Sequence, residues 1–300
     1  MKYPQYLEQG DKVSIVSPAG KIDHQIVERG AEILRNQGFQ VEIGQHAFDI
    51  DNMHAGTDVN RAFDLQKALN DKSIKAIFIS RGGYGSIRTF SHLNWSSFFK
   101  KPKWLIGFSD ITVFHAYLTN HNIPSVHGVM TAWFEKDGVL TDSFLKLMVV
   151  LKGEKLIFDV PPHPLNRNGD AIGLLTGGNL SLIQSMRGTS LDISPKGKIL
   201  FIEDIDEPHY NIDRMMQNLR VGKILENLSG LIAGYYTDMK DSETLFGKSA
   251  YMIIREAVES YSYPVVFGFG AGHELPNHPL IMGGRISLHV TDNQVEIKQL

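Results

Sequence analysis

The chain contains no cysteine among its 300 residues. This absence excludes disulfide bonds, thiolate metal sites and a cysteine nucleophile. No uninterrupted apolar run approaches the length of about 18 residues that a membrane-spanning helix requires. The first residues also contain no apolar stretch of signal-peptide length. We therefore expect a cytoplasmic protein that does not associate with a membrane.

An excess of charge of one sign is missing as well. Lys and Arg number 30 against 33 Asp and Glu, so the net charge is −3. Proteins that bind nucleic acid usually carry a basic excess, and we expect no nucleic-acid partner. The hydrophobic content of 42% and the charged content of 21% are typical of a globular protein. The length suffices for one large domain or two of ordinary size.

Strand and helix patterns alternate through the first half of the chain. Short apolar runs predict strands within 12–20, 39–44, 74–80, 103–109 and 124–129. Apolar residues at helical spacing follow most of these runs, and Thr57 is placed to cap one of the helices. This alternation indicates an α/β fold, with a parallel sheet covered by helices on both faces. Functional loops in such sheets follow the carboxyl ends of the strands.

The pattern breaks between residues 153 and 170, where three of the twelve prolines occur without periodicity. We predict a first domain over 1–152, a linker over 153–170 and a second domain over 171–300. The second domain is expected to be mixed α/β with a different topology. The end of the chain, from 285 to 300, resembles a hairpin.

Ser109 is the first candidate for chemistry. It lies in the segment GFSDIT (107–112), where an apolar strand turns directly into a helical pattern. A nucleophile elbow reads G-x-S-x-G, and this segment has only the first glycine. A strand-to-helix bend would nevertheless expose the hydroxyl. The alternative is that Ser109 or Asp110 simply caps the following helix.

The segment RGGYG (81–85) is the second candidate. Adjacent glycines after a buried strand permit positive φ angles and close approach of the backbone to a ligand. Such a turn presents amide groups to a phosphate, a carboxylate or an oxyanion. It matches neither the dinucleotide nor the P-loop motif, so no nucleotide cofactor is expected. The alternative is an ordinary glycine turn.

Two further candidates lie in the second half. Glu203 ends an apolar run and begins a series of four acids with Asp204, Asp206 and Glu207. The spacing is not that of a calcium loop, so no metal is expected. A carboxylate near the end of a buried strand needs a partner, and a histidine would serve. His273 follows an apolar run in a glycine-rich loop, where a general base can reach a pocket.

A serine, an acid and a histidine supply the parts for nucleophilic acyl transfer, although geometry rather than sequence order defines a triad. A second interpretation is a non-catalytic α/β module whose glycine turn binds an anionic ligand.

The combination of motifs resembles the LD-carboxypeptidase family of serine peptidases, which includes muropeptide LD-carboxypeptidases and microcin C self-immunity peptidases. The matching segments, in chain order, are GDKVSIVSPAG, SRGGYGSIR, WLIGFSDIT, HGVM, LTGGNLSLI, LFIEDIDEPHYNIDRMMQNL and GFGAGHELPNHPLIMGG. The resemblance implies a flavodoxin-like or class I glutamine amidotransferase-like N-terminal domain. It also implies a swivelling mixed α/β C-terminal domain and a homodimer.

The same resemblance implies the roles of the site residues. Ser109 is expected to be the nucleophile, Glu203 the acid and His273 the base, so that the triad is divided between the two domains and forms a pocket between them. The oxyanion hole is expected to be formed by the amide of Asp110 and a glycine amide, which we assign to Gly83. Arg81 and Gly82, with Arg88 as a weaker candidate, are expected to contact the substrate.

The implied activity is hydrolysis of the L,D-peptide bond before the C-terminal D-Ala of cell-wall tetrapeptides during murein recycling, without a metal or a cofactor. The alternative within the family is an immunity-type peptidase that cleaves an aminoacyl- or peptidyl-nucleotide amide.

Overall fold

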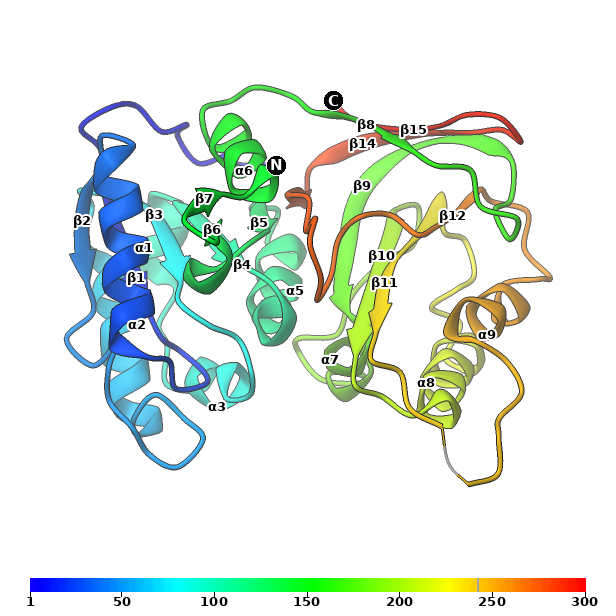
Figure 1. Ribbon diagram of the computed structural model, residues 1–300, viewed down its shortest axis with the longest axis horizontal. Helices are drawn as coiled ribbons and strands as arrows, with labels where there is room; N and C mark the ends of the chain where they lie inside the picture. The colour runs from blue at the N-terminus through cyan, green and yellow to red at the C-terminus, as the bar shows by residue number, and fades with distance from the viewer. Residues whose placement is uncertain (242) are drawn as a thin grey trace. The chain divides into compact units, whose positions relative to one another are not determined.

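The computed structural model describes residues 1–241 and 243–300. The chain divides into two compact units, one formed by 1–154 with His278–Leu280, the other by 155–277 with 281–300 (Figure 1). The predicted boundaries at 152 and 171 stay predictions. Residues 157–160, within the predicted linker, form a strand.

The first unit follows the expected alternation of strands and helices. Its elements are β1 (Lys12–Val16), α1 (His24–Asn36), β2 (Gln40–Ile43), α2 (Asp58–Asn70), β3 (Ile74–Ile79), α3 (Ser86–Phe90), α4 (Ser96–Lys100), β4 (Trp104–Gly107), the 3₁₀ turn η1 (Ser109–Ile111), α5 (Thr112–Asn120), β5 (Ser125–His127), η2 (Thr131–Trp133), β6 (Glu135–Lys136), β7 (Val139–Leu140) and α6 (Asp142–Leu151). The predicted cap is confirmed, because the Thr57 hydroxyl accepts a hydrogen bond from the amide of Asn60.

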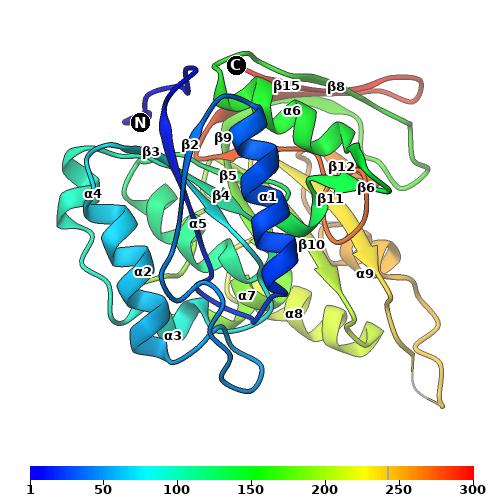
Figure 2. The same ribbon diagram turned by 60° about the vertical axis from the view of Figure 1, so that its left-hand side comes forward.

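The strand order of this unit is β2-β1-β3-β4-β5, and β13 (Leu280–Met282) continues the sheet beyond β5. The pairs among β1 to β5 are all parallel. Helices α2, α4 and α5 share a buried core with one face of the sheet, and α1 lies on the other face (Figure 2). This is the flavodoxin-like order, in which ligands bind beyond the carboxyl ends of the strands near the point where the order reverses. The loops after β1, β3 and β4 all begin at this edge of the sheet.

The second unit contains a seven-stranded mixed sheet in the order β12-β11-β10-β9-β14-β15-β8. Its elements are β8 (Ile157–Val160), β9 (Gly169–Asn179), α7 (Leu180–Ser185), β10 (Ile199–Ile205), α8 (His209–Val221), β11 (Gly230–Thr237), α9 (Ala250–Ala257), β12 (Val265–Phe267), β14 (Arg285–Val290) and β15 (Val295–Gln299). The expected terminal hairpin is confirmed as the antiparallel pair β14–β15.

Strand β9 joins the two halves of this sheet. It pairs antiparallel with β14 along its first part and parallel with β10 along its second part, as the long green strand in Figure 1 shows. Gly177 and Gly178 of β9 have φ angles of +122° and +134°. A Cβ atom on Gly177 would lie 1.9 Å from the carbonyl oxygen of Phe201 in β10. A side chain at this position therefore conflicts with the backbone of the neighbouring strand, which carries the candidate acid Glu203 near its end.

We predict that Gly177→Ala destabilises the second unit by about 3 kcal/mol or more, because a clash with backbone is added to an unfavourable φ. The matched control is Gly188→Ala, since Gly188 has a φ of +76° but no atom within 4 Å of the added Cβ. The control should lose only about 1–2 kcal/mol. Differential scanning calorimetry of both variants measures the difference, and equal losses would contradict the close approach of β9 to β10.

Candidate active site

Ser109 lies on a strained bend at the carboxyl end of β4. Its φ is +64°, in the left-handed region that side-chain-bearing residues rarely adopt. Such a conformation costs on the order of 1–3 kcal/mol and persists only where the surroundings enforce it. Helix α5 begins after Ile111, whose side chain makes no capping bond. The bend is therefore more than an ordinary helix start, as a nucleophile elbow requires.

Two contacts hold the strand that leads into this bend. A Cβ atom on Gly107 would lie 2.9 Å from Cγ1 of Ile111, so glycine allows the chain to fold back tightly. The Gly107 carbonyl oxygen also lies 2.9 Å from Nε2 of His115, and Nδ1 of that ring lies 2.7 Å from the Ser125 hydroxyl. Burial lowers the pKa of His115 to about 4. The neutral ring donates from Nε2 to Gly107 and accepts from Ser125, a structural role that the sequence spacing did not reveal.

The glycine turn, residues 81–85, lies directly beside the bend. A Cβ atom on Gly82 would lie 3.2 Å from Cβ of Ser109 and 3.5 Å from the backbone nitrogen of Asp110. Gly83 and Gly85 have φ angles of +98° and +137°. The first unit thus brings Gly82 next to Ser109 and Asp110, although more than twenty residues separate the two segments in the chain. The nearest neighbours of a Cβ atom on Gly83 belong to Gly20 instead.

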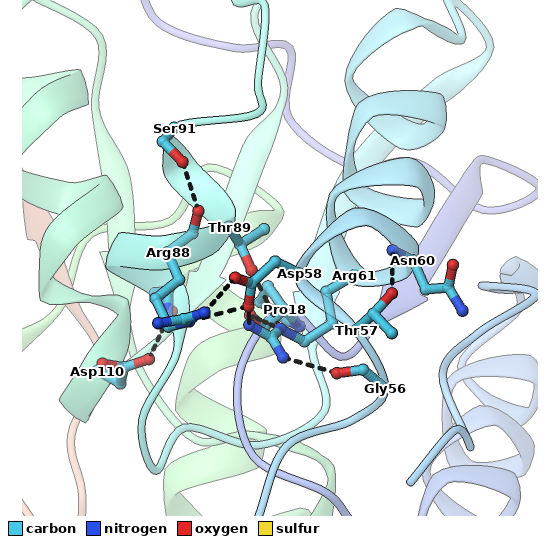
Figure 3. Close-up of polar contacts among 11 residues, drawn as sticks. Pro18, Gly56, Thr57, Asp58, Asn60, Arg61, Arg88, Thr89, Ser91 and Asp110 are labelled. Atoms are coloured by element: carbon cyan, nitrogen blue, oxygen red, sulfur yellow. Dashed lines mark hydrogen bonds and ion pairs between the residues drawn. The ribbon is translucent and has the colours of Figure 1, made fainter. Parts of the chain in front are cut away.

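The side chain of Asp110 links the bend to the glycine turn. Its Oδ2 accepts a hydrogen bond of 2.7 Å from the backbone amide of Ser86, the first residue of α3 (Figure 3). Asp110 is completely buried, and this burial raises the pKa of its carboxyl group, against the hydrogen bond that favours the charged form. The carboxylate therefore does not cap its own helix. It fixes the helix that follows the glycine turn.

Glu203 and His273 form a buried pair in the second unit. Glu203 is near the end of β10, and its Oε2 lies 2.7 Å from Nδ1 of His273, in the loop after β12. The carboxylate is fully buried, whereas the His273 side chain is 12% exposed. Gly272 permits this approach, because it has a φ of +138° and its Cβ would lie 3.2 Å from Oε2. The expected histidine partner of Glu203 is confirmed as a contact.

This pair sets the protonation of the imidazole. Burial alone would lower the pKa of His273, but the charge and hydrogen bond of Glu203 outweigh it, and the pKa is raised above its ordinary value of 6.5. In the neutral ring the Nδ1–H donates to Glu203, so Nε2 carries the lone pair. A carboxylate that orients an imidazole in this way has the geometry that the acid and the base have in a catalytic triad.

The other acids of the series have structural partners. Asp204 accepts hydrogen bonds from Asn179 and from both the amide and the hydroxyl of Ser181, while burial raises its pKa to about 6. Glu207 accepts from Asn211. Among residues 1–241 and 243–300, no group of three or more His, Asp or Glu residues is arranged to hold a metal ion. No helix in the same part of the chain is both long and apolar enough to cross a bilayer.

The two arginine candidates differ in their contacts. Arg88 forms a bidentate ion pair with the carboxylate of Asp58, so its guanidinium already has a charged partner in the first unit. Arg81 is exposed and donates one hydrogen bond of 2.8 Å to the carbonyl of Lys21. Arg81 begins the glycine turn and keeps other N–H groups on its guanidinium, so it remains the candidate for a substrate carboxylate.

The chain belongs to the LD-carboxypeptidase family. The LD-carboxypeptidase N-terminal domain matches residues 13–128, and the LD-carboxypeptidase C-terminal domain matches residues 172–288. The expected family membership is thereby confirmed.

Individual relatives are similar to this chain over almost its whole length. A probable murein peptide carboxypeptidase of Bacillus subtilis is 29% identical over 299 residues, which cover 98% of this chain and 94% of that protein. The crystal structure of the muramoyltetrapeptide carboxypeptidase from Oxalobacter formigenes has a TM-score of 0.87 at 26% identity and covers 96% of this chain and 98% of that one. The microcin C7 self-immunity protein MccF of Escherichia coli is 23% identical over 304 residues, or 90% of this chain and 87% of that protein. The expected fold class is confirmed.

We predict that Glu203→Gln lowers the pKa of His273 below 6.5. Glutamine keeps an oxygen that accepts from Nδ1 but removes the charge, so burial then dominates. NMR titration of ring-labelled histidine measures both values. The control is Glu207→Gln, a neighbouring acid that bonds Asn211 and Ser181 instead, and it should leave the raised pKa in place. An unchanged pKa in Glu203→Gln would contradict the control of His273 by this carboxylate.

Proposed function

We propose that this chain is a serine-type LD-carboxypeptidase that removes the C-terminal D-Ala from cell-wall tetrapeptides by hydrolysing the L,D-peptide bond. The observation that carries the proposal is the left-handed backbone of Ser109 beside a glycine turn, in a chain of the LD-carboxypeptidase family. The names of the relatives from B. subtilis and O. formigenes support the choice of substrate.

In the proposed reaction, Nε2 of His273 takes the proton from the Ser109 hydroxyl as its oxygen attacks the carbonyl carbon of the scissile bond. The carbonyl oxygen becomes an oxyanion. The amides of Asp110 and Gly83 are proposed to stabilise it, and loss of one such donor typically costs about 100- to 1000-fold in rate. Collapse of the intermediate breaks the C–N bond, and the imidazolium returns its proton to the leaving amine of D-Ala.

The acyl group then remains on the Ser109 oxygen as an ester. His273 removes a proton from water, and the resulting hydroxide attacks the ester carbonyl. The shortened peptide leaves with a new carboxylate, and Ser109 recovers its proton from the imidazolium. Throughout the cycle Glu203 holds the Nδ1 proton of His273 and stabilises the ring each time it becomes charged, as the contact of 2.7 Å allows.

The mechanism requires the hydroxyl of Ser109 in the first unit to meet the imidazole of His273 in the second. The substrate must also be anchored by its terminal carboxylate. We assign that contact to Arg81 with the amide of Gly82, because Arg81 stands at the start of the turn that would hold the oxyanion.

The cellular setting follows from the substrate. Tetrapeptides released from the cell wall and carried inward are available in the cytoplasm, where we place the enzyme. We further propose that the enzyme is a homodimer. The reaction needs no metal or cofactor, since a serine, a histidine and a carboxylate supply all the proton transfers.

We predict that the unmodified protein releases D-Ala from an L,D-linked tetrapeptide and leaves a pentapeptide ending in D-Ala-D-Ala intact. Ser109→Ala should lower kcat by about 1000-fold or more, because no other group can form the ester. Mass spectrometry of the released residue measures both outcomes. Ser91→Ala is the matched control, since Ser91 is exposed and its hydroxyl bonds only the carbonyl of Arg88 among the contacts described.

Hydrolysis by Ser109→Ala at the unmodified rate would contradict the proposal. The second candidate function, favoured by the match to MccF, is tested in the same assay with an aminoacyl-nucleotide amide as substrate. Rapid cleavage of that compound with no release of D-Ala from the tetrapeptide would favour the immunity-type activity. Binding of the tetrapeptide without any turnover would favour the non-catalytic module.

A further inference from the structure

We propose that Arg61 is a positioning residue that holds the glycine turn in place for oxyanion stabilisation, an inference that rests on the proposed function. Arg61 lies in the first turn of α2, and only 1% of its side chain is exposed. A fully buried guanidinium is costly unless all its N–H groups have partners. Its surroundings are therefore informative about what it does.

The guanidinium is bonded on every side (Figure 3). Nε donates to the carbonyl of Pro18 at 3.1 Å and to the hydroxyl of Thr89 at 3.2 Å. Nη1 donates to the carbonyl of Gly56 at 2.8 Å, and Nη2 contacts the carboxylate of Asp58. The acceptors come from the loop after β1, from helix α3, and from the start of α2 with the loop before it. One planar side chain thus joins three segments of the first unit.

The loop after β1 transmits this contact to the first glycines of the turn. It begins near Pro18, and two residues later the amide of Gly20 donates to the carbonyl of Gly82 at 2.9 Å. A Cβ atom on Gly83 would lie 3.5 Å from Cα of Gly20. The position of Gly82 and Gly83 therefore depends on the loop whose Pro18 carbonyl is fixed by Arg61.

The other end of the turn is held directly. A Cβ atom on Gly85 would lie 3.3 Å from Nη2 of Arg61 and 3.3 Å from Cα of Ala19. Thr89 lies one helical turn further on in α3, and its hydroxyl donates to Pro18 at 2.8 Å while it accepts from Arg61. Arg61 consequently contacts both the loop in front of the glycine turn and the helix behind it.

Asp110, next to Ser109 in the chain, also holds the glycine turn in place. Its carboxylate holds the amide of Ser86, which directly follows the turn, and the charge of Arg61 favours the ionised form of this carboxyl group. Arg61 and Asp110 thus fix the turn from opposite sides. A displacement of about 1 Å in such a site is enough to cost about 100-fold in rate.

Lysine cannot replace this arginine. The guanidinium carries five N–H donors in one plane, whereas an ammonium group is a compact charge with three. The four acceptors around Arg61 lie on three segments, so the three donors of a lysine would leave at least one acceptor without a donor. Arg61→Lys therefore loosens the turn while it keeps the positive charge near Asp58.

The test compares Arg61→Lys and Arg61→Met with Lys103→Met. Lys103 is a matched control: it is also a buried cation, and it donates to the carbonyls of Ala68 and Leu69 at the opposite end of the same helix. For both Arg61 variants we expect kcat on the tetrapeptide to fall by about 10- to 100-fold. KM should rise by a smaller factor, since the turn holds the oxyanion in the transition state while only Arg81 and Gly82 of it are assigned to the bound substrate. Lys103→Met should lower the melting temperature but keep kcat within about twofold.

Rates are measured well below each melting temperature, so that loss of folded protein does not lower kcat. Calorimetry adds a second readout: Arg61→Lys, introduced into Ser109→Ala, should weaken the Kd for the tetrapeptide by a smaller factor than the factor by which Arg61→Lys alone lowers kcat. Unmodified kcat in both Arg61 variants, an equal loss of kcat in Lys103→Met, or a Kd in the double variant weakened by as large a factor as kcat falls would overturn the role of Arg61. Full hydrolysis by Ser109→Ala would instead overturn the proposed function itself.

Discussion

The left-handed backbone of Ser109 is the constraint on which the rest of the candidate site depends. The conformation is unfavourable, so the neighbouring contacts must enforce it. Gly107 allows the chain to fold back against Ile111, and the neutral ring of His115 holds the Gly107 carbonyl. Asp110, the residue after Ser109, is tied to α3 because its carboxylate accepts a hydrogen bond from the Ser86 amide. These contacts all lie within the first unit, and together they hold Ser109 at the edge where the parallel strands end.

The second unit contributes a different kind of constraint, which is electrostatic. A fully buried carboxylate requires a charged or hydrogen-bonding partner, and Glu203 has one in His273. The same burial that would discharge the imidazole is outweighed by this neighbour, so the pKa of His273 is raised. In the proposed reaction, a base with a raised pKa holds the proton that the leaving amine needs. The proposal thus takes the nucleophile from one unit and the acid–base pair from the other, and each group is positioned by the core of its own unit.

The sequence predicted the features that depend on local pattern. Strand-and-helix alternation, the Thr57 cap and the terminal hairpin are confirmed, as is the histidine partner of Glu203. Local pattern also favoured a helix cap at the bend, but α5 has no side-chain cap at its start. The direction of the Asp110 side chain and the network of Arg61 depend on contacts between segments far apart in the chain, which spacing and composition do not encode. The domain boundaries and the roles of the site residues stay predictions.

The most direct test of the central claim is covalent trapping with a fluorophosphonate, which reacts with an activated serine hydroxyl. Peptide mapping by mass spectrometry identifies the modified residue among all the serines of the chain. We predict a single phosphonylated residue, Ser109, whose labelling is slowed by the tetrapeptide and abolished in His273→Ala. Labelling of another serine, or ready hydrolysis of the tetrapeptide by protein in which Ser109 is fully blocked, would contradict the account.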